Sequence, residues 1–177
     1  MTRIAFLPAA AALLALAACQ SPTATPAPGA NSADAGFITD AYQIIEFDRQ
    51  EGAIAQTQAR DPRVKAIAAR LVDEANQYAT QLAPIAMAAG VRPPDVLRYD
   101  LRVRLGHMRL QPGIGFDRAY LDDQIASHEE VLRNEDMMNP QEYSPNLMGL
   151  AERGKDLIRH NLADLQALRQ SMAGASS

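Results

Sequence analysis

The segment from Val64 to Ile85 carries a small or apolar side chain at every third or fourth position, and this period constrains the fold most. The stripe consists of Val64, Ile67, Leu71, Ala75, Tyr78, Leu82 and Ile85. Steps of three and four place these side chains on one face of an α-helix. Such a face is stable only when it packs against another element, so the segment predicts a helix within a larger helical core.

The rest of the chain supports an all-α fold. Aromatic residues make up only 5% of the sequence and Trp is absent, so the core rests on aliphatic residues and methionine. We expect helices at 37–60, 62–90, 95–110, 116–137 and from 145 to about 172. Asp61-Pro62 is a typical helix start, with an N-cap residue followed by proline. Four long helices and one short helix in the link 90–115 predict an up-down four-helix bundle of two hairpins.

The first residues predict export and a lipid anchor. Arg3 precedes an apolar run that is too short to span a bilayer, a pattern typical of a signal peptide over 1–18. The run ends in Ala17-Ala18-Cys19, which resembles the lipobox at which bacterial lipoproteins are cut and acylated. Cys19 is the only cysteine, so we expect it to carry the lipid; an ordinary signal peptide with a chance cysteine is the alternative.

The sequence after Cys19 places a domain at a membrane surface. Residues 19–35 are rich in Pro, Ala, Ser and Thr and predict a tether, followed by a bundle over 36–172 and a disordered tail over 173–177. Gln20 favours the outer membrane, because Asp at this position is the signal that retains enteric lipoproteins in the inner membrane. We therefore expect a lipid-anchored protein of the bacterial envelope that faces the periplasm, with the membrane and an envelope protein as partners.

Charge argues against nucleic acid as a partner. The net charge is −4 for the whole sequence, and loss of residues 1–18 removes Arg3 and no acidic residue, which gives −5. An acidic domain has no electrostatic attraction for a phosphate backbone. Four arginines at 98, 102, 104 and 109 could grip an anionic headgroup, but salt bridges to the acidic bundle explain them better.

From Phe37 to Leu168 the chain resembles the DUF4142 family of ferritin-like four-helix proteins of bacterial envelopes. The resemblance rests on Phe37-Ile38-Thr39, Asp61-Pro62-x-Val64-Lys65, Arg70-Leu71-Val72-Asp73, Phe116-Asp117-Arg118-Ala119-Tyr120-Leu121, His128-Glu129 and Arg159-His160-Asn161-Leu162. It implies a ferritin-like bundle and no defined activity. It also implies histidines at the positions of Ala75, His128 and Asn161 and an acidic residue at Asp48, of which this sequence keeps Asp48 and His128.

The remaining polar residues do not predict a di-iron centre. Ferritin-like centres take a Glu-x-x-His pair from each of two helices, and no histidine here has Glu three positions before it. A single metal ion at Asp48 and His128, with Asn161 behind them, is one hypothesis. The other is a core histidine bonded to Asp48 or Asn161. An Asp156–His160 pair could also hold a surface metal, but a solvated face is the simpler interpretation.

Two functions follow from these patterns. The first is a non-enzymatic envelope lipoprotein that binds a partner or contributes to envelope upkeep or stress tolerance, with no cofactor. The alternative is a metal-binding or redox protein that uses Asp48 and His128. They differ in whether these two side chains meet in the bundle with room for an ion. A subunit of a larger assembly would instead expose a large apolar patch.

Overall fold

The computed structural model describes residues 32–111 and 113–174, and the predicted signal peptide, Cys19 and most of the tether lie outside them. In this part of the chain every regular element is a helix, as the periodicity predicted. The elements are α1 (Ser32–Gln58), α2 (Pro62–Ala88), α3 (Tyr99–Arg109), α4 (Gly113–Asp136), a 3-10 turn η1 (Pro140–Glu142) and α5 (Pro145–Gly174). None of the described helices has the length and apolar content needed to cross a membrane.

The boundaries agree with local capping signals and differ where tertiary contacts act. Asp61 caps α2 by accepting a hydrogen bond from the backbone N–H of Arg63 at 2.8 Å, with Pro62 at the first position. The helix α1 begins at Ser32, so residues 32–35, which we assigned to the tether, are helical. The cause is tertiary, because buried Asp34 accepts a hydrogen bond from the Ser144 N–H before α5.

Three other helix boundaries also differ from the prediction. Gly113, with φ of +57°, begins α4 three residues before the predicted start at 116, so the chain turns at one glycine. Residues 173 and 174, assigned to a disordered tail, belong to α5. The short α3 begins at Tyr99 and not at residue 95. The link that follows the prolines at 93 and 94 stays non-helical as far as Arg98.

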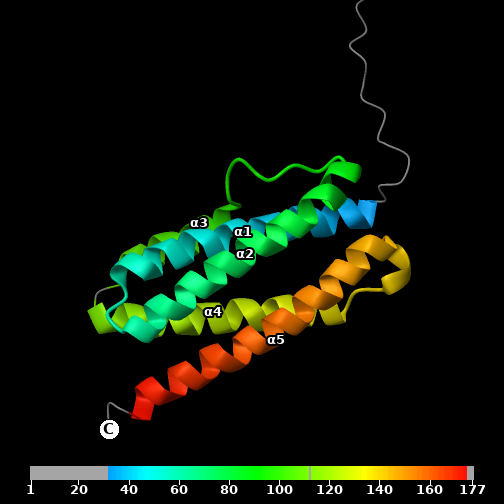
Figure 1. Cartoon of the computed structure of the whole chain (residues 1–177). Helices are drawn as coiled ribbons and strands as arrows, with labels where there is room; N and C mark the ends of the chain where they lie inside the picture. Colours follow the sequence, from blue (N-terminus) through cyan, green and yellow to red (C-terminus); the bar gives the residue numbers. More distant parts are fainter. Residues whose placement is uncertain (1–31, 112, 175–177) are drawn as a thin grey trace, which may run out of the picture.

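The four long helices form two antiparallel hairpins that face each other (Figure 1). Asp117 at the start of α4 binds the turn between α1 and α2, and Arg63 of α2 binds Ser171 near the end of α5. Hence α4 runs parallel to α2, and α5 runs parallel to α1. The link through α3 returns the chain along α1, which is the single crossover of ferritin-like bundles.

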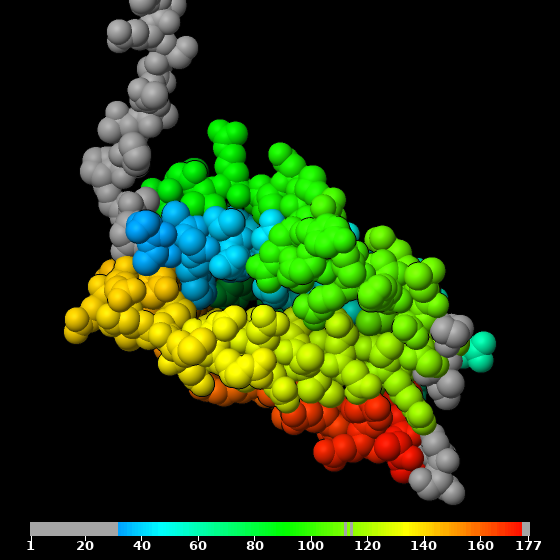
Figure 2. Space-filling model, turned by 180° about the vertical axis from the view of Figure 1, so that it is seen from behind, coloured from blue at the N-terminus to red at the C-terminus, as the bar shows by residue number. Residues whose placement is uncertain are grey.

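The bundle is packed more tightly at one end than at the other. Near the α1–α2 turn, a buried cluster joins all four long helices around Phe116, Tyr120, Leu121 and Leu165, which are fully buried. A second cluster anchors Phe47 of α1 under α3 through Leu97, Leu101 and Leu105. At the opposite end, several stripe residues, including Phe37, Ala75 and Tyr78, are only partly buried. Their incomplete burial reflects a cavity at that end, which is open to the surface (Figure 2).

Candidate functional site

The site is a cavity of about 550 Å³ between the two hairpins. It runs along α1 from Ala33 to Asp48, a length of about 20 Å at the helical rise of 1.5 Å per residue. Figure 2 shows the surface hollowed between the N-terminal half of α1 and the C-terminal half of α4. The volume lies in the range of small-molecule sites.

Apolar side chains from all four long helices make most of its wall. Three of them, Leu71, Ala75 and Tyr78, belong to the stripe that the periodicity of 64–85 placed in the core. The others include Phe37, Ala41, Ile44, Ile45, Val131, Leu157 and Ile158. Polar and charged groups stand among them, namely Asp40, Asp48, Glu74, Arg98, Ser127, His128, Glu130, Asn134, Glu135 and Asn161. A mainly apolar wall with a few polar groups is the usual composition of a ligand site.

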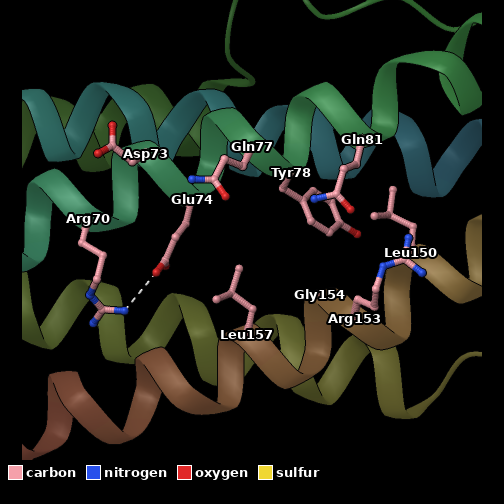
Figure 3. A pocket seen from close by; sticks show the side chains of 10 residues that line it. All are labelled: Arg70, Asp73, Glu74, Gln77, Tyr78, Gln81, Leu150, Arg153, Gly154 and Leu157. Atoms are coloured by element: carbon pink, nitrogen blue, oxygen red, sulfur yellow. Dashed lines mark hydrogen bonds and ion pairs between the residues drawn. The ribbon is translucent and has the colours of Figure 1, made fainter.

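A second cavity of about 580 Å³ lies between α2 and α5, and Figure 3 shows the side chains around it. Both cavities are lined by Glu74, Tyr78, Gly154 and Leu157, so these residues form the wall between them. Gly154 makes room for Tyr78, since a Cβ there would lie 2.8 Å from Cε2 of the ring. Burial, with Glu135 nearby, raises the pKa of Tyr78, so this hydroxyl is neutral at physiological pH.

The four positions singled out in the sequence all line the first cavity: Asp48, Ala75, His128 and Asn161. His128 is buried, and its Nδ1–H donates to the carbonyl oxygen of Gln124 at 2.9 Å. The predicted bond from His128 to Asp48 or Asn161 is therefore replaced by one within its own helix. Burial lowers the pKa of His128, so the ring is neutral and Nε2 carries a lone pair.

Asn161 takes part in a different network. It donates from Nδ2 to Glu74 at 2.7 Å, and its Oδ1 accepts from the guanidinium of Arg70 at 2.6 Å. Arg70 also forms ion pairs with Glu74 at 3.1 Å and with Asp164 at 2.8 Å. The network ties α2 to α5 below the cavity, and Figure 3 shows the Arg70–Glu74 pair.

The motif Phe116-Asp117-Arg118-Ala119-Tyr120, on which the family resemblance partly rests, has a structural role that begins with Asp117. Its fully buried carboxylate accepts from the backbone N–H groups of Arg60 and Asp61 at 2.9 and 2.8 Å. Phe116 and Tyr120 stack in the core with ring centroids 6.3 Å apart. These residues therefore maintain the fold.

The profile of the family described as "Domain of unknown function (DUF4142)" matches residues 19–168. The chain belongs to the DUF4142 family. No curated protein and no solved structure matched the chain. In this DUF4142 chain the matched region contains all the residues that line both cavities.

One part of the site was not assigned a role from the sequence. Glu51, fully buried one turn beyond Asp48, accepts a hydrogen bond from Nε2 of Gln124 at 2.5 Å. Gln124 also reaches Asp48 at 3.4 Å. The spacing in the sequence could have indicated this group. Glu51 follows Asp48 by three residues on the same face of α1, and Gln124 lies one helical turn before His128. Two buried carboxyl groups therefore share one amide donor.

The pKa values of these two carboxyl groups are raised. Burial raises the pKa of Asp48 to about 7, although Gln124 and the positive charge of Arg104 oppose the shift. Burial, together with the negative charge of Asp123, holds the pKa of Glu51 well above its usual range. The positive charge of Arg104 offsets only a small part of these shifts, because Arg104 forms a two-armed ion pair with Asp123 at 2.8 and 3.2 Å.

The other sequence candidates lie on the surface. His160 is exposed and lies 3.6 Å from Asp164, whereas Asp156 pairs with Arg159, so the predicted solvated face is what the structure shows. Arg98 pairs with Asp40 and Asp100, and Arg104 pairs with Asp123, as expected for two of the four arginines of the link.

The donor set does not fit a ferritin-like metal centre. Alanine and asparagine stand at 75 and 161, where the resemblance implied histidines, which leaves the imidazole of His128 and the carboxylate of Asp48. Within 32–111 and 113–174, no three His, Cys, Asp or Glu side chains are grouped so as to hold a metal ion. Metal binding by Asp48 and His128 alone stays a prediction.

Proposed function

We propose that this DUF4142 chain is a non-enzymatic lipoprotein of the bacterial envelope that acts by binding, and that its ligand occupies the cavity between α1 and α4. The observation that carries the proposal is the cavity itself. A core of this size normally packs to the density of an organic crystal, and each void costs contact energy. An opening of about 550 Å³ among apolar side chains of four helices is therefore a feature that a bound molecule would compensate.

The position of the cavity fits an anchored protein. It reaches the first turn of α1, where Ala33 and Gly36 line it, and the proposed tether to Cys19 precedes that turn. A protein held by a lipid on Cys19 would place the bundle within tether length of the membrane. The proposed role is to hold a molecule of the envelope near the membrane surface and so contribute to envelope upkeep.

Blocking the cavity tests the binding function. Ala75 lies in the wall on α2, so Ala75→Phe puts a ring into the cavity, whereas exposed Ala66→Phe on the same helix leaves it open. The mature chain with Cys19→Ser would be titrated with the neutral apolar dye N-phenyl-1-naphthylamine. We expect binding by the parent and by Ala66→Phe and a loss of about tenfold or more in Ala75→Phe. Equal binding by all three proteins contradicts the proposal.

The anchor has a separate test. Cells producing the full sequence would be fractionated beside cells producing Cys19→Ala. We expect the parent in the membrane fraction, with a mass increase on residue 19 that matches acylation, and the variant without it. The same distribution and mass for both proteins would rule out the anchor and leave the binding function untouched.

A protein partner has its own candidate surface. Val96, Tyr99, Val103 and Leu110 are exposed and follow one another at helical spacing along α3 and its approach. Apolar side chains in a row on the surface are typical of a contact face. A photo-crosslinking residue at Tyr99 would capture an envelope protein, and the same residue at exposed Asp73 of α2 serves as the control.

The metal alternative is favoured by one observation, that Asp48 and His128 line the same cavity. Elemental analysis of the purified chain beside His128→Ala tests it. Stoichiometric metal in the parent that disappears in the variant would make this a metalloprotein. Absence of metal after reconstitution with iron, manganese, zinc and copper would reject the alternative.

A further inference from the structure

The charges around the α1–α4 cavity have one predominant sign. Five carboxylate side chains line it, Asp40, Asp48, Glu74, Glu130 and Glu135, against the single cation of Arg98. The neutral His128 ring adds no positive charge. An acidic wall around an apolar space lowers the local energy of a cation and raises that of an anion.

Some of these carboxylates already have a cation. Asp40 pairs with Arg98 at 3.3 Å, and Glu74 pairs with Arg70 at 3.1 Å. Arg98 is also shared with Asp100, at 3.0 Å. The positive charge at the cavity is therefore already used by the wall and is not available to a ligand.

Asp48 and Glu135 differ from the others. The hydrogen bond to Asp48 comes from Gln124 at 3.4 Å, and Gln124 itself is bound more closely to Glu51 at 2.5 Å. Arg104, on the far side, is held by Asp123. Among the described residues, the buried Oε2 atom of Glu135 has no hydrogen-bond partner. Each of these groups lies in the cavity wall without a cation bonded to it. Burial raises the pKa of both, so each carboxyl group is ionised at low cost only when a ligand supplies a positive charge.

His128 adds an acceptor beside this wall. Its Nδ1 must carry the proton, because a carbonyl oxygen can only accept. Its Nε2 then carries a lone pair that can accept a hydrogen bond, and His128 lines the same cavity as Asp48. A carboxylate and an imidazole lone pair together suit a group that has several N–H donors and a positive charge.

We propose that the cavity binds a lipophilic amine, that is, a protonated primary amine with a single long apolar chain. The ammonium group donates to Asp48 and to Nε2 of His128, and the chain lies along Ile44, Val131 and Ile158 toward Phe37 and Tyr143. The length of about 20 Å accommodates an extended chain. This inference rests on the proposed function, because it names the class of ligand for the same cavity.

Three probes of equal chain length test the ligand class. Dodecylammonium, dodecanol and dodecanoate would each be titrated by calorimetry into the mature Cys19→Ser chain, below the concentration at which each forms micelles. We expect dodecylammonium to bind about tenfold or more tightly than either of the others, because only its head group can form charge-assisted bonds to Asp48. Dodecanoate binding as tightly as dodecylammonium would overturn the proposal.

Variants then locate the head group. Asp48→Asn keeps the shape of the side chain and removes its charge, and exposed Asp73→Asn on α2 makes the same charge change outside this cavity. We expect Asp48→Asn to weaken dodecylammonium about tenfold while dodecanol binding stays the same. His128→Ala should weaken the amine as well, to a smaller extent. Equal losses in Asp48→Asn and Asp73→Asn would reject Asp48 as the partner of the ammonium group.

The results separate this inference from the function on which it rests. If dodecanol and dodecylammonium bind equally and Ala75→Phe abolishes both, the cavity is a binding site but the amine class is wrong. If none of the three probes binds and the apolar dye also fails, both proposals are wrong. Thermal unfolding of each variant shows that it is folded, so loss of binding cannot be assigned to loss of structure.

Discussion

The carboxylate of Asp117, at the start of α4, accepts a hydrogen bond from the backbone N–H of Asp61 at 2.8 Å, in the turn between α1 and α2. A second hydrogen bond, from the N–H of Arg60, reaches the other oxygen at 2.9 Å. One side chain thus satisfies two backbone N–H donors of the turn between α1 and α2, and it joins the two hairpins. The cavity lies between these hairpins, so their relative position decides its shape.

Replacing Asp117 should cost more stability than replacing other acidic residues of α4. Asp117→Ala leaves two backbone donors without their partner, and we expect a loss of about 2 to 3 kcal/mol in the free energy of unfolding. Asp122→Ala is the matched control, because it breaks an exposed ion pair with Arg169 and should cost at most about 1 kcal/mol. Urea unfolding measures both. Equal losses would show that the Asp117 bonds contribute little.

Gly154 should resist substitution because of Tyr78. Gly154→Ala brings its Cβ to 2.8 Å from the ring, so we expect a loss of about 1 to 2 kcal/mol despite the better helix propensity of alanine. Gly149→Ala, where the nearest atom lies at 3.7 Å, should gain up to about 1 kcal/mol. In a Tyr78→Ala background the penalty at Gly154 should disappear. A penalty that persists there would place the conflict elsewhere.

The raised pKa of Glu135 predicts how the stability of the fold depends on pH. Burial raises this pKa to about 7, so the folded state holds a proton that the unfolded chain has lost. The fold therefore loses stability as pH rises from about 4.5 to about 7. Glu135→Gln should remove about 1 to 2 kcal/mol of that loss, less than the full shift implies because solvent screens a half-buried group.

The measurement for Glu135 is the free energy of unfolding at pH 5 and at pH 8. Glu135→Gln should be more stable than the parent at pH 8 and nearly equal to it at pH 5. Glu129→Gln, on the same helix and outside the cavity wall, is the control. A parallel change in both variants would mean that general charge, and not the burial of Glu135, causes the pH dependence.

Histidines at 75 and 161, the positions where the resemblance implies them, should create a metal site. Ala75, His128 and Asn161 line one cavity together with Asp48, so Ala75→His with Asn161→His would place three imidazoles and a carboxylate around the same space. We expect the double variant to bind Co²⁺ with the visible spectrum of nitrogen and oxygen ligands. The parent is the control for adventitious binding. A colourless double variant that is folded would show that the four positions do not converge closely enough.

The sequence by itself determined the helices and the faces that they bury. The stripe from Val64 to Ile85, and the Asp61-Pro62 start, define α2 through the local periods and caps that a helix requires. The stripe includes Ala75, and the family resemblance singled out Asp48, His128 and Asn161 beside it; all four line one cavity. These properties depend on neighbours within a few residues, and so they are readable along the chain.

Only the tertiary structure decided what those faces meet. The start of α1 at Ser32 follows from the bond between Asp34 and Ser144, which are 110 residues apart. His128 bonds to Gln124 within its own helix, whereas Asn161 bonds to Arg70 and Glu74 of another helix. The cavity is the volume that side chains from four helices fail to fill, and such a difference depends on the distance between the hairpins. No local pattern encodes that distance.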